Sequence, residues 1–178
     1  YQEVIRINSQ SGKGGVAYVL EQEHGIKMPR WLQVDFSPMV QKEAEVTEAE
    51  VSGEQIADLF QRTYLEPESS MRMKSYQVNR QQGQDSMEAV LIDGDTETSI
   101  HGEGRGVLEA FTSALSKHIG KDLVIIEYNE HTLGQDDASD AIAYVQLSIN
   151  SQRVCRAGRS QDILGATLRA ILNAVARV

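Results

Sequence analysis

Two glycine-rich segments contain the residues whose types and spacing could bind a small anion. The stronger candidate is Gly102–Gly106, GEGRG, which leads directly into an apolar helical pattern that starts at Val107. The first amides of a helix have no intrahelical acceptor and lie at the positive end of the helix dipole, so they suit a carboxylate. A tight strand-to-helix turn without any ligand explains the same pattern more simply, and local sequence alone favours that interpretation.

The second segment is Ser9–Gly15, SQSGKGG, which we predict to be a loop with left-handed backbone at some of its glycines. It lacks the G-x-x-x-x-G-K-[ST] spacing of a phosphate-binding loop, and no clear helix pattern follows it. As a phosphate site it is a weak candidate.

The chain has no pattern typical of a catalytic or metal site. The four histidines are scattered: His24, His101, His118 and His131. Cys155 lies in a predicted strand with no histidine nearby, which favours a structural thiol over a nucleophile. Asp136-Asp137 could bind a cation, although such a pair more often marks a turn or the start of a helix. An independent enzyme is therefore the least favoured class.

Composition restricts the class of protein further. The 178 residues are 40% hydrophobic with a net charge of −9, as in a soluble globular protein. No apolar run is long enough for a membrane span, and the acidic balance argues against nucleic acid or an anionic membrane as partner. One cysteine suits a reducing compartment, so we expect a cytoplasmic protein. The chain starts without methionine, and we expect it to be part of something larger.

Residues 1–68 predict a small, mostly helical linker subdomain. We expect a strand over 2–8, strand or helix over 16–23, and a helix over 32–45. A second helix starts at Ser52, which forms a capping box with Gln55. Eight acids against two bases in residues 42–68 indicate a solvated helical linker, with an acidic partner-docking face as the alternative. A domain boundary is predicted near residue 68.

Residues 69–178 predict two copies of a β-β-β-α unit, over about 71–120 and 122–178. The predicted strands cover 72–79, 87–91 and 95–101, then 123–131, 141–149 and 153–157. A helix follows each set, from Val107 and from about Gln161 with Ser160 as its N-cap. A shift of 56 residues superposes Gly102 on Gly158 and Leu108 on Leu164, as in an internal repeat. Apolar side chains on both faces of strand 123–131 predict a helix on one face and a second subunit or a ligand on the other.

The fold class is thus α+β, with a pseudo-symmetric pair of β-β-β-α units after a helical subdomain.

Four runs of this sequence resemble the C-terminal part of the 2-isopropylmalate synthase family, in order and over essentially the whole chain. They are VIRINSQSGKGGVAYVLE (Val4–Glu21), LQVDFS (Leu32–Ser37), IHGEGRGVLEAF (Ile100–Phe111) and IIEYNEHTLGQDDASDAIAYV (Ile125–Val145). Citramalate and homocitrate synthases are the nearest alternatives.

The resemblance implies what the chain does and what it lacks. In that family an N-terminal (β/α)8 barrel condenses acetyl-CoA with 2-oxoisovalerate and uses a divalent metal. The barrel is absent here, so this chain should be catalytically inert and need no cofactor of its own. The family's regulatory domain binds leucine at a dimer interface as a feedback inhibitor. The implied partners are therefore leucine, a second copy of the chain and the parent barrel.

The resemblance also implies a leucine site. Its residues are Gly104, Gly106, Leu108, Ile125, Tyr128, Thr132, Asp136, Asp137 and Ala138. Helix-start amides would receive the carboxylate, backbone carbonyls or an aspartate the ammonium, and Leu108 with Ile125 would enclose the isobutyl group. Glu109 departs from the small residue expected at its position. An isoleucine-sensing citramalate synthase domain and a purely structural dimerisation module remain the alternatives.

Overall fold

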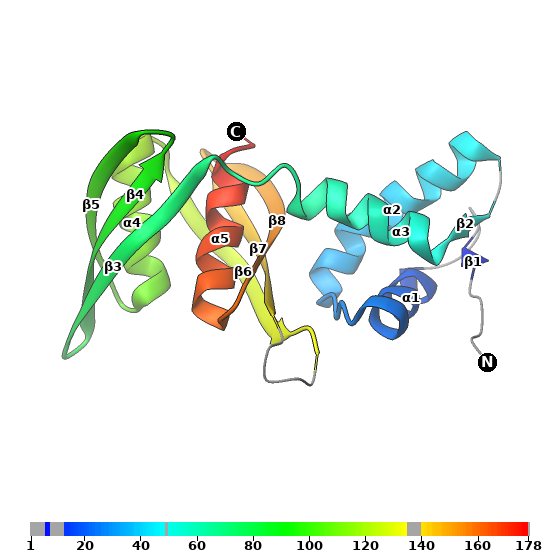
Figure 1. Ribbon diagram of the computed structural model, residues 1–178, viewed down its shortest axis with the longest axis horizontal. Coiled ribbons are helices and arrows are strands. Elements are labelled where there is room, and N and C mark those ends of the chain that lie inside the picture. Colours follow the sequence, from blue (N-terminus) through cyan, green and yellow to red (C-terminus); the bar gives the residue numbers. More distant parts are fainter. Residues whose placement is uncertain (1–5, 8–12, 49, 135–139, 178) are drawn as a thin grey trace.

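The computed structural model describes residues 6–7, 13–48, 50–134 and 140–177. Three parts follow one another along its longest axis (Figure 1). The first β-β-β-α unit lies at one end, the second unit lies in the middle, and the helices of the N-terminal part lie at the other end. The C-terminus ends beside the middle part.

The N-terminal part is mostly helical, as predicted. Its elements are β1 (Arg6–Ile7), α1 (Lys13–His24), α2 (Arg30–Thr47), β2 (Val51–Ser52), α3 (Gly53–Phe60) and the single-turn π-helix η1 (Gln61–Leu65). The predicted helix over 32–45 is confirmed as α2, and Leu32, Phe36 and Val40 are fully buried on one face of it. The capping box is present, since the Ser52 hydroxyl accepts from the Gln55 amide at 3.2 Å and the Gln55 side chain accepts from the Ser52 amide at 2.8 Å.

The predicted loop over Ser9–Gly15 is wrong at its end, because α1 starts at Lys13. Residues 8–12 lie outside the described part of the chain. Glycine in a helix costs about 1 kcal/mol relative to alanine. Burial of Val16, Val19 and Leu20 in the helical core outweighs that cost. The segment 16–23, left open between strand and helix, is therefore helix.

Two antiparallel three-stranded sheets, each followed by a helix, form the rest of the chain and confirm the α+β class. The first unit comprises β3 (Met71–Gln81), β4 (Gln84–Asp93), β5 (Thr96–Gly104) and α4 (Val107–Ile119). The second comprises β6 (Leu123–Thr132), β7 (Ala141–Ile149), β8 (Gln152–Ser160) and α5 (Ile163–Val175). The central strand of each sheet is the middle one in sequence.

The predicted repeat has a steric basis in Gly102 and Gly158. A Cβ at Gly102 would lie 2.4 Å from the Ala114 amide nitrogen, and a Cβ at Gly158 would lie 2.4 Å from that of Ala170. Each glycine therefore lets the helix of its unit lie directly on its sheet. The first strand of each unit also carries a register shift, between Met73 and Ser75 in β3 and between Ile125 and Glu127 in β6.

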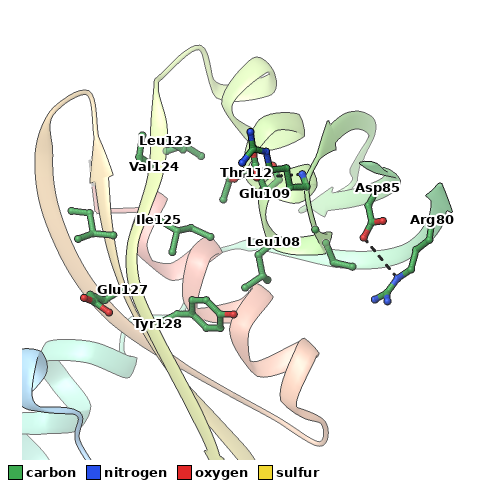
Figure 2. A pocket seen from close by; sticks show the side chains of 14 residues that line it. Arg80, Asp85, Leu108, Glu109, Thr112, Leu123, Val124, Ile125, Glu127 and Tyr128 are labelled. Atoms are coloured by element: carbon green, nitrogen blue, oxygen red, sulfur yellow. Dashed lines mark hydrogen bonds and ion pairs between the residues drawn. The ribbon is translucent and has the colours of Figure 1, made fainter. Parts of the chain in front are cut away.

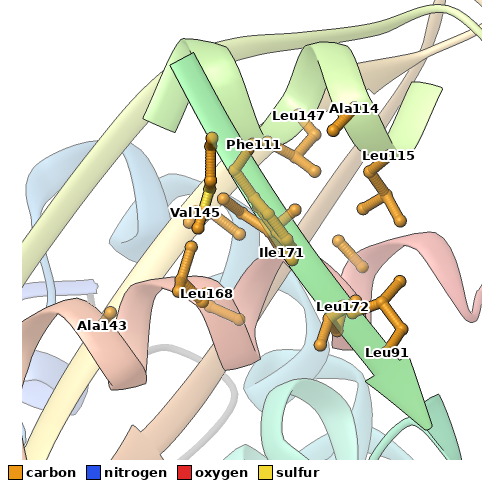
Figure 3. Packing of buried hydrophobic residues seen from close by; sticks show 14 of the residues in the cluster. Leu91, Phe111, Ala114, Leu115, Ala143, Val145, Leu147, Leu168, Ile171 and Leu172 are labelled. Atoms are coloured by element: carbon orange, nitrogen blue, oxygen red, sulfur yellow. The ribbon is translucent and has the colours of Figure 1, made fainter. Parts of the chain in front are cut away.

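The two units share one hydrophobic core (Figure 3). Phe111 and Leu115 of α4 belong to the same cluster as Ile171 and Leu172 of α5, and all four side chains are buried. The inward side chains of both sheets, including Val145, close the same cluster. Each unit thus buries its apolar sheet face and its amphipathic helix against the other unit.

Two boundaries predicted at the helix starts are wrong. Gly102–Gly104 is not a turn but the end of β5, where Gly104 pairs with Asp85 of β4, so only Arg105 and Gly106 connect β5 to α4. Ser160 is not the N-cap of α5. It remains in β8, and Asp162 caps the helix by accepting from the Gly165 amide at 2.6 Å.

The helical part packs on the outer face of the second sheet. Ile142, Tyr144 and Ala157 point into the helical core, where the ring of Tyr144 lies 6.4 Å from that of Phe60. The helical part of the same chain therefore covers the outer face of β7 and β8. Val124, Ile126 and Tyr128 of β6 remain exposed, so the second subunit or ligand expected on strand 123–131 stays a prediction. Because the helical core spans both sides of residue 68, the division at that residue stays a prediction.

Arginine and asparagine side chains hold the junction between the helical part and the units. The buried Arg156 guanidinium donates to the carbonyls of Tyr64 (2.8 Å), Pro67 (3.0 Å) and Asn173 (3.1 Å). The Asn173 side chain, also buried, accepts from the Ser69 amide at 2.8 Å. Burial lowers the pKa of Arg156 to about 10, with a smaller contribution from Arg177, so the guanidinium stays charged at neutral pH.

Three smaller expectations concern the surface and Cys155. Every acid in residues 42–68 is exposed except the half-buried Glu43, as expected for a solvated surface. Burial raises the pKa of the Cys155 thiol to about 12, and the charge of Asp35 adds to this effect. The thiol therefore stays protonated at neutral pH, as expected of a structural cysteine. Within the described ranges, no helix is long and apolar enough to cross a membrane.

Candidate functional site

A groove of about 1020 Å³ runs between the start of α4 in the first unit and β6 in the second (Figure 2). The first unit contributes residues 105–109 and Thr112 together with Arg80 and Asp85, and the second contributes residues 123–128. This volume is at the upper end of the range for small-molecule sites, about 300–1,000 Å³.

Four of the nine residues implied by the resemblance line this groove: Gly106, Leu108, Ile125 and Tyr128. Gly104 lies at the end of β5 and is not part of the lining. Thr132 lies four residues along β6 from Tyr128, which is roughly 13 Å in an extended strand, and is not part of the lining. Asp136, Asp137 and Ala138 lie outside the described residues.

The two glycines at the start of α4 have different environments. A Cβ at Gly104 would lie 2.7 Å from the Ala110 amide nitrogen and 2.7 Å from the Glu109 Cβ, so close packing requires glycine there. A Cβ at Gly106 would meet nothing within 4 Å, and its φ of −161° is open to any residue. Gly106 is therefore not required by packing within this chain, and a side chain there would enter open space beside the groove.

The helix starts of the two units differ in how their amides are satisfied. Asp162, the N-cap of α5, accepts from the Gly165 amide, so the second unit supplies its own carboxylate. The equivalent N-cap of α4 is Gly106, which has no side chain to accept from the amides of Val107 to Glu109. Of the two helix starts, that of α4 is therefore the one suited to an external carboxylate.

A carboxylate of the chain lies close to these amides. Glu109, in the first turn of α4, accepts from the Arg105 amide through Oε2 at 3.2 Å. In a capping box this side chain would accept from the N-cap amide, but here it accepts from the residue before the N-cap, so this hydrogen bond satisfies none of the first amides of α4. The departure from a small residue at position 109 therefore places a negative charge at the start of the helix.

Charged residues that the sequence did not single out also line the groove. Asp85 has a largely buried side chain, 13% exposed, and lies 3.7 Å from Arg80. Glu127 and Arg105 complete the set. Among the described residues no cluster of three histidine, cysteine or acidic side chains could hold a metal ion. The groove therefore presents side chains of both charges, which could pair with the two charged groups of a zwitterion.

The strand that lines the groove also contacts the helical part. Beyond Tyr128, Asn129 accepts from the Trp31 indole of α2 at 2.9 Å. His131 accepts from the Lys27 amide at 3.3 Å, and its Nε2 lies 2.7 Å from the Tyr144 hydroxyl. One continuous strand, β6, thus joins the groove to α2 and to the segment that precedes it.

Comparison with known proteins identifies this arrangement. A family model described as the LeuA allosteric (dimerisation) domain matches residues 50–178, which include both units and the groove. A second model, the alpha-isopropylmalate synthase post-catalytic domain-like family, matches residues 1–21. The chain therefore belongs to the LeuA allosteric (dimerisation) domain family.

Curated relatives of this chain are named 2-isopropylmalate synthase. The protein from Pseudomonas syringae pv. syringae is 39% identical over 99% of this chain and 31% of its own length. Those from Mesorhizobium japonicum (35%) and Mycobacterium leprae (38%) match 100% and 99% of this chain and 33% and 30% of their own lengths. The chain thus spans about a third of the length of these relatives.

Proposed function

We propose that this chain is the leucine-sensing, dimerising region of a 2-isopropylmalate synthase and that leucine binds in the groove between α4 and β6. The observation that carries the proposal is the uncapped start of α4, which opens into a groove with apolar side chains on the facing strand. The amides of Val107 and Leu108 would receive the leucine carboxylate, and Leu108 with Ile125 would enclose the isobutyl group. Asp85 would receive the ammonium.

The size and surface of the groove support a homodimer. The cavity is larger than one amino acid fills, and Val124, Ile126 and Tyr128 of β6 are 58%, 47% and 47% exposed. Exposed apolar side chains on an edge strand fit a second copy of the chain. The parent activity, condensation of acetyl-CoA with 2-oxoisovalerate on a separate barrel with a divalent metal, is part of the proposal.

The proposed regulation uses β6. An inhibitor shifts an equilibrium only by binding one arrangement more tightly than another. Because β6 lines the groove and then contacts Trp31 and the Lys27 amide, leucine that favours one position of β6 also favours one position of the helical part.

Calorimetric titration with leucine, isoleucine and valine tests the proposed function. We expect leucine to bind with the lowest Kd and to raise the melting temperature, because a ligand of the native state stabilises it. Preference for isoleucine would favour a citramalate synthase domain. If millimolar leucine produced neither heat nor a shift in melting temperature, the structural dimerisation module would be the remaining interpretation.

Trp31, the one tryptophan of the chain, reports on the contact between β6 and α2. We expect leucine to change its fluorescence with the same midpoint as in calorimetry. Asn129→Ala removes the acceptor of the indole and should abolish this change while leaving the leucine Kd within about twofold, because Asn129 does not line the groove. A fluorescence change that persists in Asn129→Ala would contradict transmission through this contact.

A further inference from the structure

The side chain of Glu109 lies at the same helix start to which we assign the carboxylate of the proposed effector. Figure 2 shows Glu109 at the start of α4, among the side chains that line the groove. Its Oε2 accepts from the Arg105 amide at 3.2 Å. The amides of Val107 and Leu108 follow within the same first turn, so a carboxylate bound to them would lie next to that of Glu109.

We infer that the Glu109 carboxylate is a built-in competitor for the effector carboxylate and sets how tightly this groove binds an α-amino acid. The inference rests on the proposed function and deepens it. Two carboxylates at one helix start repel each other, and they compete for the positive end of the helix dipole. Leucine must therefore displace the Glu109 side chain or bind beside an uncompensated like charge.

The second unit shows how a helix start in this fold is satisfied without a ligand. There Asp162 accepts from the Gly165 amide, and α5 is capped by its own chain. Glu109 of the first unit stands at the third helical position but accepts, at 3.2 Å, from the amide of Arg105, which precedes the N-cap Gly106. The Glu109 carboxylate thus lies at the helix start of α4 without capping its first amides.

The charges of the groove add to the effect. Its lining carries the acids Asp85, Glu109 and Glu127 against the bases Arg80 and Arg105. Arg80 lies beside Asp85, with 3.7 Å between Nε and Oδ2. A ligand that keeps the ammonium and the isobutyl group but has no carboxylate therefore suits this groove better than it would suit one without Glu109.

Calorimetry with leucine and with leucinamide, which replaces the carboxylate by a neutral amide, tests the inference. In Glu109→Ala we expect the leucine Kd to fall at least tenfold and the leucinamide Kd to change less than threefold. Glu109→Gln keeps a neutral acceptor and should lie between the wild type and Glu109→Ala. Glu103→Ala is the matched control, because Glu103 is an exposed acid of the adjacent strand that does not line the groove and accepts from Gln84 instead. It should leave both Kd values unchanged.

The outcomes separate this inference from the proposed function. Equal leucine affinity in the wild type and Glu109→Ala, or weaker binding by Glu109→Ala, overturns the role of Glu109 and leaves leucine sensing intact. If the wild type and both Glu109 variants, Glu109→Ala and Glu109→Gln, fail to bind leucine while their circular dichroism is unchanged, the proposed function is overturned. The inference is then overturned with it. A gain shared by Glu103→Ala attributes the effect to net charge and overturns the positional claim.

Discussion

Gly106→Leu is expected to weaken leucine binding at least 50-fold, about 2.3 kcal/mol, while the free chain stays folded. Position 106 lines the groove, and a side chain added there meets no atom within 4 Å. The new isobutyl group would therefore enter the space that we assign to the ligand. Leucine is a poorer N-cap than glycine, so the free energy of unfolding should fall by no more than about 1 kcal/mol. Calorimetry and urea denaturation measure the two effects.

Gly104→Ala is the matched control for this prediction. Its Cβ would lie 2.7 Å from the Ala110 amide nitrogen, so either β5 or α4 must move. We expect a loss of about 1–3 kcal/mol in the free energy of unfolding, as for other overpacked sites. If Gly106→Leu instead bound leucine as tightly as the wild type, the groove beside Gly106 would not be the leucine site.

Arg156→Met is expected to reduce the free energy of unfolding by at least about 3 kcal/mol. The guanidinium is only 2% exposed and supplies donors to three backbone carbonyls, those of Tyr64, Pro67 and Asn173. Two of these belong to the last turns of η1 and α5, where carbonyls have no intrahelical donor. Methionine fills part of the volume but leaves these acceptors buried and unpaired, at about 1–3 kcal/mol each.

Arg159→Met serves as the comparison for Arg156→Met. Arg159 also lies in β8, but its side chain is 47% exposed and its contact with Asp140 is 3.4 Å long. Exposed pairs of this kind contribute about 0–1 kcal/mol. Urea denaturation should therefore separate the two variants by at least about 2 kcal/mol. Equal losses would mean that the carbonyl contacts of Arg156 do not hold the junction.

The sequence predicted those elements in which the spacing of apolar residues coincides with the buried face. Helix α2 follows from Leu32, Phe36 and Val40, and the two units follow from the 56-residue repeat of Gly102 and Gly158. Element ends were less predictable, because pairing with a distant strand decides them. Ser160 has the chemistry of an N-cap, yet it pairs with Ala141 and stays in β8.

The candidate site was only partly predictable for the same reason. Leu108, Ile125 and Tyr128 come from the resemblance, and the structure places them in one groove. Asp85 enters this groove because the β3–β4 hairpin brings it opposite Arg80, and β4–β5 pairing brings it opposite Gly104. No local pattern marks that position. Hairpin register, counted from the turn near Gly83, is the signal that could have found it.

A methyl NMR titration tests the central claim, leucine binding between α4 and β6, most directly. In the chain with labelled leucine, isoleucine and valine methyl groups, leucine should shift the signals of Leu108, Val124 and Ile125, which line the groove. Leu168 and Leu172 line the corresponding cavity beside the self-capped α5 and should not shift. Shifts at Leu168 and Leu172 without shifts at Leu108 and Ile125, or no shifts at millimolar leucine, would contradict the account.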